Sequence, residues 1–161
     1  MSISLDPISI ADLQALASCE TPLALLGQCA NGALPPAFVA SRALEHLRNG
    51  KPYIWCSTFY IRANDGTVIG GCGFKDIPHA GRVEIGYAVS REHQGRGTAT
   101  EAIRLLLAFP FESGDVKEVF AQISEQNIAS TRVVQKLGFA SRGIKTDSDG
   151  ELLVQWVACA T

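Results

Sequence analysis

The segment from Arg82 to Ile123 limits the possible folds most strongly, because its hydrophobic pattern changes period twice. Apolar residues alternate loosely over 82–89 and recur at helical spacing after Gly97, and 116–123 is again strand-like. The pattern therefore predicts a strand, a helix and a second strand in direct succession. A crossover of this kind brings its two strands parallel and side by side in one sheet. We therefore expect an α/β fold built around this unit.

The N-terminal part of the sequence predicts two helices followed by an antiparallel meander. Asp12 can cap a short first helix, and Pro35-Pro36 precede a second helix that stops at Asn49-Gly50. Two strand-like runs follow, and the Asp65-Gly66 pair between them is a strong hairpin signal. With the strand at 82–89 they form the meander: 53–62 and 67–74.

The C-terminal part predicts one more helix and a closing hairpin. Pro110 should end or kink the helix that follows Gly97, because proline lacks a backbone N–H. A further helix over 128–137 is followed by Gly138, in the position of a left-handed C-terminal cap. The last two strand-like runs close a mixed, mostly antiparallel sheet: 139–145 and 151–158. The chain has no internal repeat or linker, so we expect a single domain over residues 1–161.

Composition narrows the possible partners. Of the 161 residues 47% are apolar and 19% are charged, which is typical of a globular domain. A net charge of -2 disfavours a nucleic-acid partner, which needs a basic face. The five scattered cysteines form no metal-ligand or redox motif, so we expect no metal and mostly buried free thiols. Neither the N-terminus nor the longest apolar run predicts a targeting or membrane segment, so we expect a cytoplasmic protein without a membrane partner.

The run His93–Ala99 joins a strand to a helix and is the segment best suited to chemistry. Its small residues let the backbone approach a ligand closely, and the N–H groups and dipole of a helix N-terminus attract phosphate or pyrophosphate. Arg91 and Arg96 can add full positive charges beside it. The alternative is that Gly95 and Gly97 only make a tight turn.

Two common phosphate-binding motifs do not fit this run. A P-loop needs a lysine and a hydroxyl after its last glycine, whereas Gly97 is followed by Thr98-Ala99. A dinucleotide-binding fold opens with its glycine-rich turn, whereas three antiparallel strands precede this one. The anion site therefore belongs to a different fold.

The loop reads Gln94-x-x-Gly97-x-Ala99, and further segments flank it: Val83–Tyr87, Glu101-Ala102, and Asn127-x-x-Ser130 followed by Lys136–Phe139. Together these segments resemble the GNAT superfamily of N-acetyltransferases, in particular its branch of RimJ/RimL-type ribosomal-protein N-terminal acetyltransferases. The loop pattern is similar to that family's acyl-CoA pyrophosphate loop. The resemblance implies the GNAT fold, with a sheet splayed between the strands at 82–89 and 116–123. It also implies acetyl-CoA as cosubstrate.

The resemblance further implies residue roles. Ala88 and Val89 would pair with the pantetheine arm as an added strand. Asn127 would hydrogen-bond that arm, although it can equally cap the following helix, and both can hold at once. Ser130 would lie near the thioester. The pyrophosphate loop, with Gln94 at its start, would hold the cofactor through the backbone amides of these residues: Gly95, Arg96, Gly97, Thr98 and Ala99.

Acetyl transfer to an amine needs a base and a way to stabilise the departing thiolate. Glu84 is the base that the resemblance suggests, directly or through a water; the alternative is a surface carboxylate. Many relatives have a tyrosine as the acid where this chain has Val134. Ser130 is a weak candidate for that role, with water or no acid as alternatives. His93 is more typical of a solvent-facing residue than of a catalyst.

The acceptor is not encoded by a motif. We expect its pocket to involve residues 24–51 and the final hairpin. An α-amine has a pKa of about 7.7–8.0 and a lysine side chain about 10.4, so deprotonation at pH 7 costs about 1 against about 4–5 kcal/mol. This favours a peptide N-terminus or an amino-acid-like amine. Two alternatives remain, an inert acyl-CoA-binding sensor or scaffold and a plain interaction module. The protein can be a monomer or a homodimer, since the last hairpin offers an edge.

Overall fold

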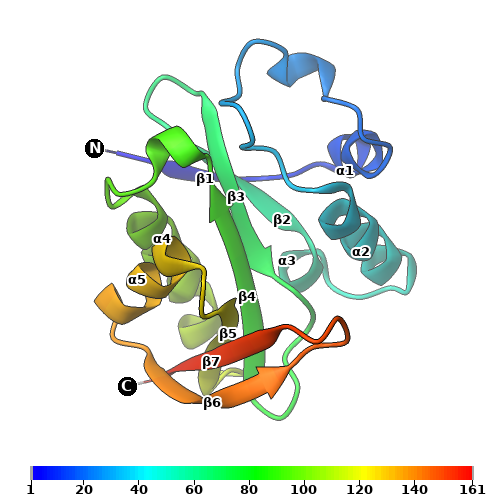
Figure 1. Cartoon of the computed structure of the whole chain (residues 1–161). Helices are drawn as coiled ribbons and strands as arrows, with labels where there is room; N and C mark the ends of the chain where they lie inside the picture. Colours follow the sequence, from blue (N-terminus) through cyan, green and yellow to red (C-terminus); the bar gives the residue numbers. More distant parts are fainter. Residues whose placement is uncertain (1, 161) are drawn as a thin grey trace.

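A computed structural model describes residues 2–160. One seven-stranded sheet, with strand order β1-β2-β3-β4-β5-β7-β6, forms the centre of the molecule (Figure 1). The helices α4 and α5 lie to one side of it and α1 and α2 to the other (Figure 1). The first half of the chain supplies β1 Ser4–Pro7, α1 Ile10–Ala17, a 3-10 turn Leu23–Leu25, α2 Ala37–Arg48, α3 Tyr53–Cys56, β2 Thr58–Arg62, β3 Val68–Phe74 and β4 Arg82–Val89.

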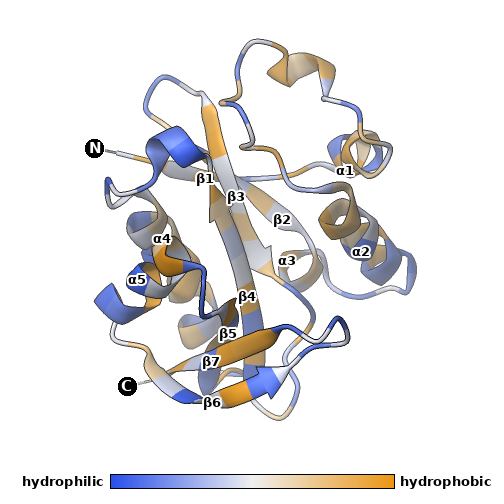
Figure 2. Ribbon diagram, viewed as in Figure 1, coloured by the Kyte–Doolittle hydropathy of each residue, from blue (hydrophilic) through white to orange (hydrophobic). Residues whose placement is uncertain are grey.

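The second half follows the predicted order of helices and strands. It contains a 3-10 turn Arg91–His93, α4 Thr98–Ser113, β5 Glu118–Ser124, α5 Ile128–Lys136, β6 Ala140–Thr146 and β7 Leu152–Cys159. The meander is antiparallel as expected, β4 and β5 are parallel, and β6 and β7 form the closing hairpin. The strands carry hydrophobic stretches, whereas α5 is largely hydrophilic where it faces outward (Figure 2).

The splay between β4 and β5 follows from how short their pairing is. Only Arg82, Val83 and Glu84 of β4 have partners on β5. Beyond Glu84, β4 continues to Val89 along β3, and β5 continues to Ser124 along β7. The two strands therefore separate, and the edge of β4 over residues 85–89 has no strand partner on the β5 side within the described chain.

The predicted start of the first strand of the meander was wrong. The predicted strand over 53–62 begins with one helical turn, α3, and only Thr58–Arg62 is a strand. Packing explains the difference, because the buried ring of Trp55 lies 4.9 Å from that of Phe74 and 5.1 Å from that of Phe109. The four-residue strand β1, which pairs with β2 at the edge of the sheet, was not predicted.

The start of α1 also corrects the sequence reading. Ser9, rather than Asp12, caps this helix, since its Oγ accepts the Asp12 N–H at 3.1 Å. The Asp12 carboxylate instead accepts the hydroxyl of Tyr60 at 2.9 Å. Burial and this hydrogen bond raise the pKa of Tyr60 above its ordinary value. Asp12 thus ties α1 to the sheet.

The two helix ends that were predicted from glycine and proline behave differently. Gly138, at φ 81°, ends α5 as expected: its N–H donates to the Gln135 carbonyl at 3.1 Å and the next N–H, of Phe139, to the Val134 carbonyl at 2.9 Å. Pro110 does not end α4, which continues to Ser113. Pro110 is buried in this helix, so its apolar ring contributes to packing although it cannot donate a backbone hydrogen bond.

The buried residues form two clusters. The larger lies between the sheet and α4–α5, and the smaller joins α1 and α2 to Tyr60 and Val68. All five cysteines are free, but only Cys56 and Cys72 are buried, which corrects the expectation of mostly buried thiols. Burial raises the pKa of the Cys72 thiol to about 12, so this side chain behaves as a small apolar residue.

Candidate active site

A cavity of about 600 Å³ lies at the end of β4, beside the N-terminal turns of α4 and α5. We call it the loop cavity. The site residues proposed from the sequence meet here with two exceptions, since Arg96 and Glu84 do not line it. Those that do are Ala88, Val89, Gln94, Gly95, Gly97, Thr98, Ala99, Asn127 and Ser130.

The loop before α4 presents its backbone to this cavity. Gly95 and Gly97 have φ of 76° and 77°, which an L side chain rarely adopts, and a Cβ on either would meet no atom within 4 Å. Gly97 is the N-cap of α4, and no side chain caps the helix there. Within residues 2–160 the N–H groups of Gly95, Arg96 and Gly97 donate to no backbone carbonyl. The loop therefore offers an anion several unused N–H groups at a helix N-terminus.

Two side-chain contacts hold this loop against the sheet. The Gln94 amide donates to the Val89 carbonyl at 3.1 Å, which folds the loop back onto the end of β4. The buried Ser90 hydroxyl lies 2.6 Å from Nδ1 of His93. His93 therefore lines the cavity as part of the scaffold and does not simply face solvent.

The charge of the loop cavity suits a phosphorylated ligand. Its lining contains Arg132 and Lys136 and, among the described residues, no carboxylate. Sequence reasoning pointed to Arg91 and Arg96 instead, and both are exposed outside the lining. The basic residues of α5 were missed because nothing local in the sequence shows that α5 packs beside the loop.

The N-terminus of α5 closes the cavity on the side of β4. Asn127 is the N-cap, and its Oδ1 accepts the Ser130 N–H at 3.1 Å, so the capping interpretation of Asn127 is confirmed. The Tyr87 hydroxyl donates to the Ser130 carbonyl at 2.7 Å. This contact joins α5 to the splayed end of β4, and burial raises the pKa of Tyr87 above its ordinary value. Val134 is fully buried and faces the core.

A second cavity, of about 390 Å³, lies on the other side of the β4 end, between the sheet and α2. We call it the α2 cavity. It shares four lining residues with the loop cavity, so the two cavities meet there: Tyr87, Ala88, Asn127 and Ser130. Its wall comes from residues 33–42 and from Glu151 and Leu153 of the final hairpin, the two segments expected to form the acceptor pocket.

Glycines make the floor of the α2 cavity. Gly71 and Gly73 of β3 and Gly86 of β4 line it where side chains would otherwise stand. A Cβ on Gly73 would lie 3.0 Å from the Ser57 carbonyl oxygen, and one on Gly86 would lie 3.1 Å from Cε of Lys75. The absence of side chains at these positions therefore both creates the cavity and allows the strands to pack closely.

Glu84 is the last residue of β4 that pairs with β5, and the splay between the two strands begins there. Its Oε2 lies 2.8 Å from Nζ of Lys75, and the two side chains are 20% and 34% exposed. Glu84 itself lines neither cavity, whereas Lys75 lines the α2 cavity. The carboxylate therefore contacts a residue that lines this cavity but does not line the cavity itself.

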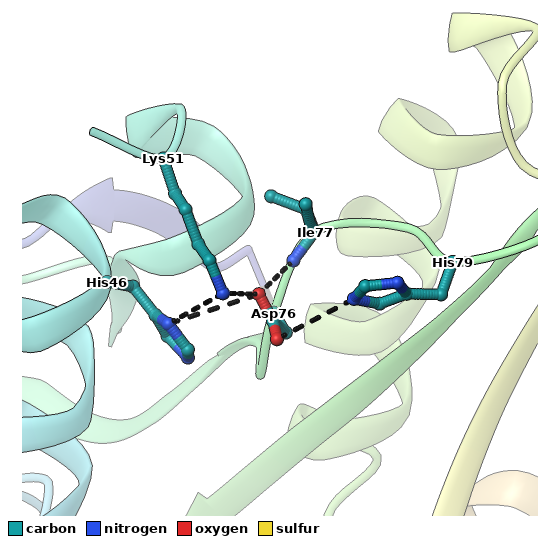
Figure 3. Close-up of polar contacts among 5 residues, drawn as sticks. All are labelled: His46, Lys51, Asp76, Ile77 and His79. Atoms are coloured by element: carbon teal, nitrogen blue, oxygen red, sulfur yellow. Dashed lines mark hydrogen bonds and ion pairs between the residues drawn. The ribbon is translucent and has the colours of Figure 1, made fainter. Parts of the chain in front are cut away.

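The residue after Lys75 anchors the same loop (Figure 3). One carboxylate oxygen of Asp76 accepts from Lys51 Nζ at 2.8 Å and from the Ile77 N–H at 2.7 Å. His46 on α2 and His79 lie 3.9 and 3.8 Å from this carboxylate. Partial burial opposes ionisation of Asp76, yet the two hydrogen bonds and the nearby charges of His46 and Lys51 hold its pKa below the usual range. The cluster thus fixes the loop that carries Lys75 to the end of α2.

Asp76→Asn should lower the free energy of unfolding by about 0.5–1 kcal/mol at pH 7, a small effect because the carboxylate is 37% exposed and screened by solvent. The pKa of Asp76 is lowered on folding, so its contribution is present above the unfolded value of about 3.9 and is lost as pH falls below it. Urea unfolding between pH 3 and 7 measures this. The matched control is Asp115→Asn, whose exposed carboxylate has no partner in the described chain; an equal effect of both would contradict the prediction.

Two negative findings concern the described residues. No helix among them is long and apolar enough to cross a bilayer. Across residues 2–160, no group of three or more histidine, cysteine or acidic side chains is arranged to hold a metal ion.

Comparison with known proteins agrees with the architecture. Residues 3–140 match a family model described as "Acetyltransferase (GNAT) domain". The chain is 37% identical over 81 residues to "Uncharacterized N-acetyltransferase p20" of Bacillus licheniformis, which covers 50% of this chain and 46% of that protein. The chain thus spans about half the length of the curated relatives it matches.

Solved structures share the fold over nearly the whole chain. Mycobacterium smegmatis RimJ in complex with CoA-disulfide has a TM-score of 0.69 at 20% identity, and covers 98% of this chain and 82% of that one. A spermidine N-acetyltransferase SpeG chimera from Vibrio cholerae and hSSAT has a TM-score of 0.70 at 14% identity, with 99% and 96% covered. At these identities the likeness concerns the fold alone.

Proposed function

The chain belongs to the GNAT acetyltransferase family, and we propose that it transfers an acetyl group from acetyl-CoA to a primary amine. The observation that carries this proposal is the meeting of the two cavities at Tyr87, Ala88, Asn127 and Ser130. One cavity is suited to a phosphorylated cofactor and the other to a small acceptor. A thioester held at their junction would be within reach of an amine that enters from the α2 side.

The loop cavity fits the cofactor. The unused N–H groups of the loop at Gly95–Gly97 would hold the pyrophosphate, and Arg132 and Lys136 would add charge. The free edge of β4 at 85–89 would pair with the amides of the pantetheine arm, because unpaired backbone groups need a partner. Acetyl-CoA supplies the acetyl thioester on which the amine acts.

The residues of the α2 cavity would prepare the amine. An amine attacks only when neutral, so a base must take its proton, and Glu84 is our candidate. Because Glu84 is bound to Lys75, the proton would reach the carboxylate beside that lysine or through a water. Backbone N–H groups at the splay would stabilise charge on the carbonyl oxygen. Ser130 lies at the junction and is our candidate hydroxyl to assist the departing thiolate, with water or no acid as the alternatives, whereas buried Val134 cannot take this role.

Thermal unfolding with acetyl-CoA, free CoA or NAD tests the cofactor site. At a concentration of about 100 times Kd, a ligand that binds only the folded chain raises the free energy of unfolding by about 2.7 kcal/mol. For a chain of this size this raises Tm by roughly 5–10 °C. We expect this shift with acetyl-CoA and with CoA but not with NAD. No shift at millimolar acetyl-CoA would contradict the cofactor site. A shift without CoA release from any amine would instead indicate the binding-only sensor or scaffold.

A further inference from the structure

Arg42 is a charged residue of the α2 cavity whose guanidinium has no hydrogen-bond or ion-pair partner in the described chain. It lies on α2, lines the cavity and is only partly exposed. No side chain or carbonyl within the described part of the chain forms a hydrogen bond or ion pair with its guanidinium. Burial lowers the pKa of Arg42, although nearby Glu84 and Asp76 favour its charged form. Arginine always stays charged in proteins, so the cavity contains a partly desolvated cation that lacks a partner.

The acidic residues near Arg42 are already engaged. Glu84 is bound to Lys75 at 2.8 Å, and Asp76 to Lys51 at 2.8 Å. Neither of these two carboxylates lines the cavity, and the one carboxylate in its described lining belongs to Glu151, which is exposed on the hairpin at the rim. The interior of the cavity therefore has a cation to offer and no free carboxylate, which suits an anionic ligand group.

The wall of the α2 cavity beside Arg42 is apolar. Residues 33–36 and Val39 contribute mostly aliphatic and proline surface, and the side chain of Phe38 is 69% exposed. With the glycine floor between this wall and the junction, the cavity accommodates a compact ligand that has an apolar side group.

We propose that the acceptor is a small amino-acid-type amine with an apolar side chain, whose carboxylate binds Arg42 while its amine reaches the junction of the two cavities. This rests on the proposed acetyl transfer. In the reaction the amine nitrogen forms a bond to the acetyl carbonyl carbon, the C–S bond breaks with its electron pair leaving on sulfur, and the proton lost by the amine ends on the thiolate. The products are an N-acetyl amino acid and CoA. A polyamine such as spermidine would bring further positive charge to Arg42 and Lys75.

A matched acceptor series tests the proposal through CoA release. Leucine, leucinamide and 3-methylbutylamine share the side chain and amine, but only leucine carries a carboxylate; spermidine is the polycation. We expect kcat/KM for leucine to exceed that of each other amine by about tenfold or more. The amine of leucinamide has a lower pKa than that of leucine, so leucinamide is the more reactive of these two at neutral pH. Its intrinsic reactivity therefore works against the expected preference for leucine. Equal use of leucine and leucinamide, or preference for spermidine, overturns the carboxylate proposal and leaves acetyl transfer standing.

Arg42→Gln should raise KM for leucine by about tenfold and leave KM for leucinamide and the acetyl-CoA thermal shift unchanged. The matched control is Arg48→Gln, an exposed arginine of the same helix outside the cavity. Removing an unpartnered charge should not impair folding. An equal change for both acceptors would overturn the role of Arg42.

A binding measurement without turnover separates the two proposals. With CoA present, N-acetylleucine should stabilise the wild-type chain more than N-acetyl-3-methylbutylamine does, and Arg42→Gln should abolish the difference. This result with no CoA release from any amine would overturn acetyl transfer and keep the carboxylate site. Equal stabilisation by the two products would overturn the carboxylate site.

Discussion

Replacing Glu84 by glutamine should lower kcat/KM for the acceptor by about 10²- to 10⁴-fold, the usual contribution of a positioned general base. Glutamine keeps the shape and a hydrogen-bond acceptor for Lys75, which lies 2.8 Å from the carboxylate, but it cannot take up a proton at neutral pH. Because Glu84 lines neither cavity, the thermal shift with acetyl-CoA should stay that of the wild type. Steady-state assay of CoA release over pH 6–9 measures the loss.

The control for this prediction is Glu151→Gln. It removes the same charge from the rim of the α2 cavity, and it changes an exposed residue that we place in no proton transfer. We expect its kcat to remain within about threefold of the wild type. If Glu84→Gln keeps activity at that level too, Glu84 is a structural partner of Lys75 and the base is another group or solvent.

Ala129→Glu should weaken acetyl-CoA binding by about tenfold or more. Ala129 is exposed in the first turn of α5 and lines the loop cavity, so the substitution places a carboxylate where the cofactor's phosphates are expected. Two like charges about 7 Å apart repel by about 2.4 kcal/mol at an effective dielectric constant near 20. The helix dipole stabilises a carboxylate in the first turn, so the substitution should not lower the free energy of unfolding. Isothermal titration with acetyl-CoA measures the affinity.

The matched variant for this effect is Gln135→Glu. It adds the same charge to the same helix at an exposed position that does not line the loop cavity. We expect its affinity for acetyl-CoA to stay close to that of the wild type, with the small residual change screened at physiological salt. Equal weakening by both variants would point to a long-range effect of net charge and against the loop cavity as the phosphate site.

Local signals predicted well the fold of the half that we assign to the cofactor. The hydrophobic periodicity of the strand at 82–89 and of the helix after Gly97 comes from residues on one face of each element. It can therefore be recognised from a short stretch of sequence. Gly138 was readable for the same reason, because its left-handed cap depends on neighbouring carbonyls alone. Where the reading failed, distant packing decided. The turn at Tyr53–Cys56 is helical because Trp55 packs between rings from β3 and α4.

The residues of the α2 cavity, which we assign to the acceptor, were not predictable one by one. Gly73 and Lys75 come from the end of β3 and the residue after it, whereas Arg42 comes from α2, and only the fold brings α2 to the same cavity. Nothing in the neighbouring sequence marks Arg42 as different from Arg48, which lies on the same helix. Likewise Glu84 was identified through its place before the loop, and its pairing with Lys75 depends on the register of β3 against β4.

The separation of the buried residues into two clusters has an evolutionary consequence. The smaller cluster, with Leu13, Ala40 and Tyr60, supports α1 and α2, of which α2 lines the α2 cavity, whereas the larger one supports the loop and α4–α5. Leu47 packs against both and is among the few side chains that join them. Substitutions in residues 8–44 can therefore accumulate with little effect on the half that we assign to the cofactor. After gene duplication, one copy could acquire a new acceptor by remodelling this N-terminal segment alone, while its donor chemistry is inherited intact.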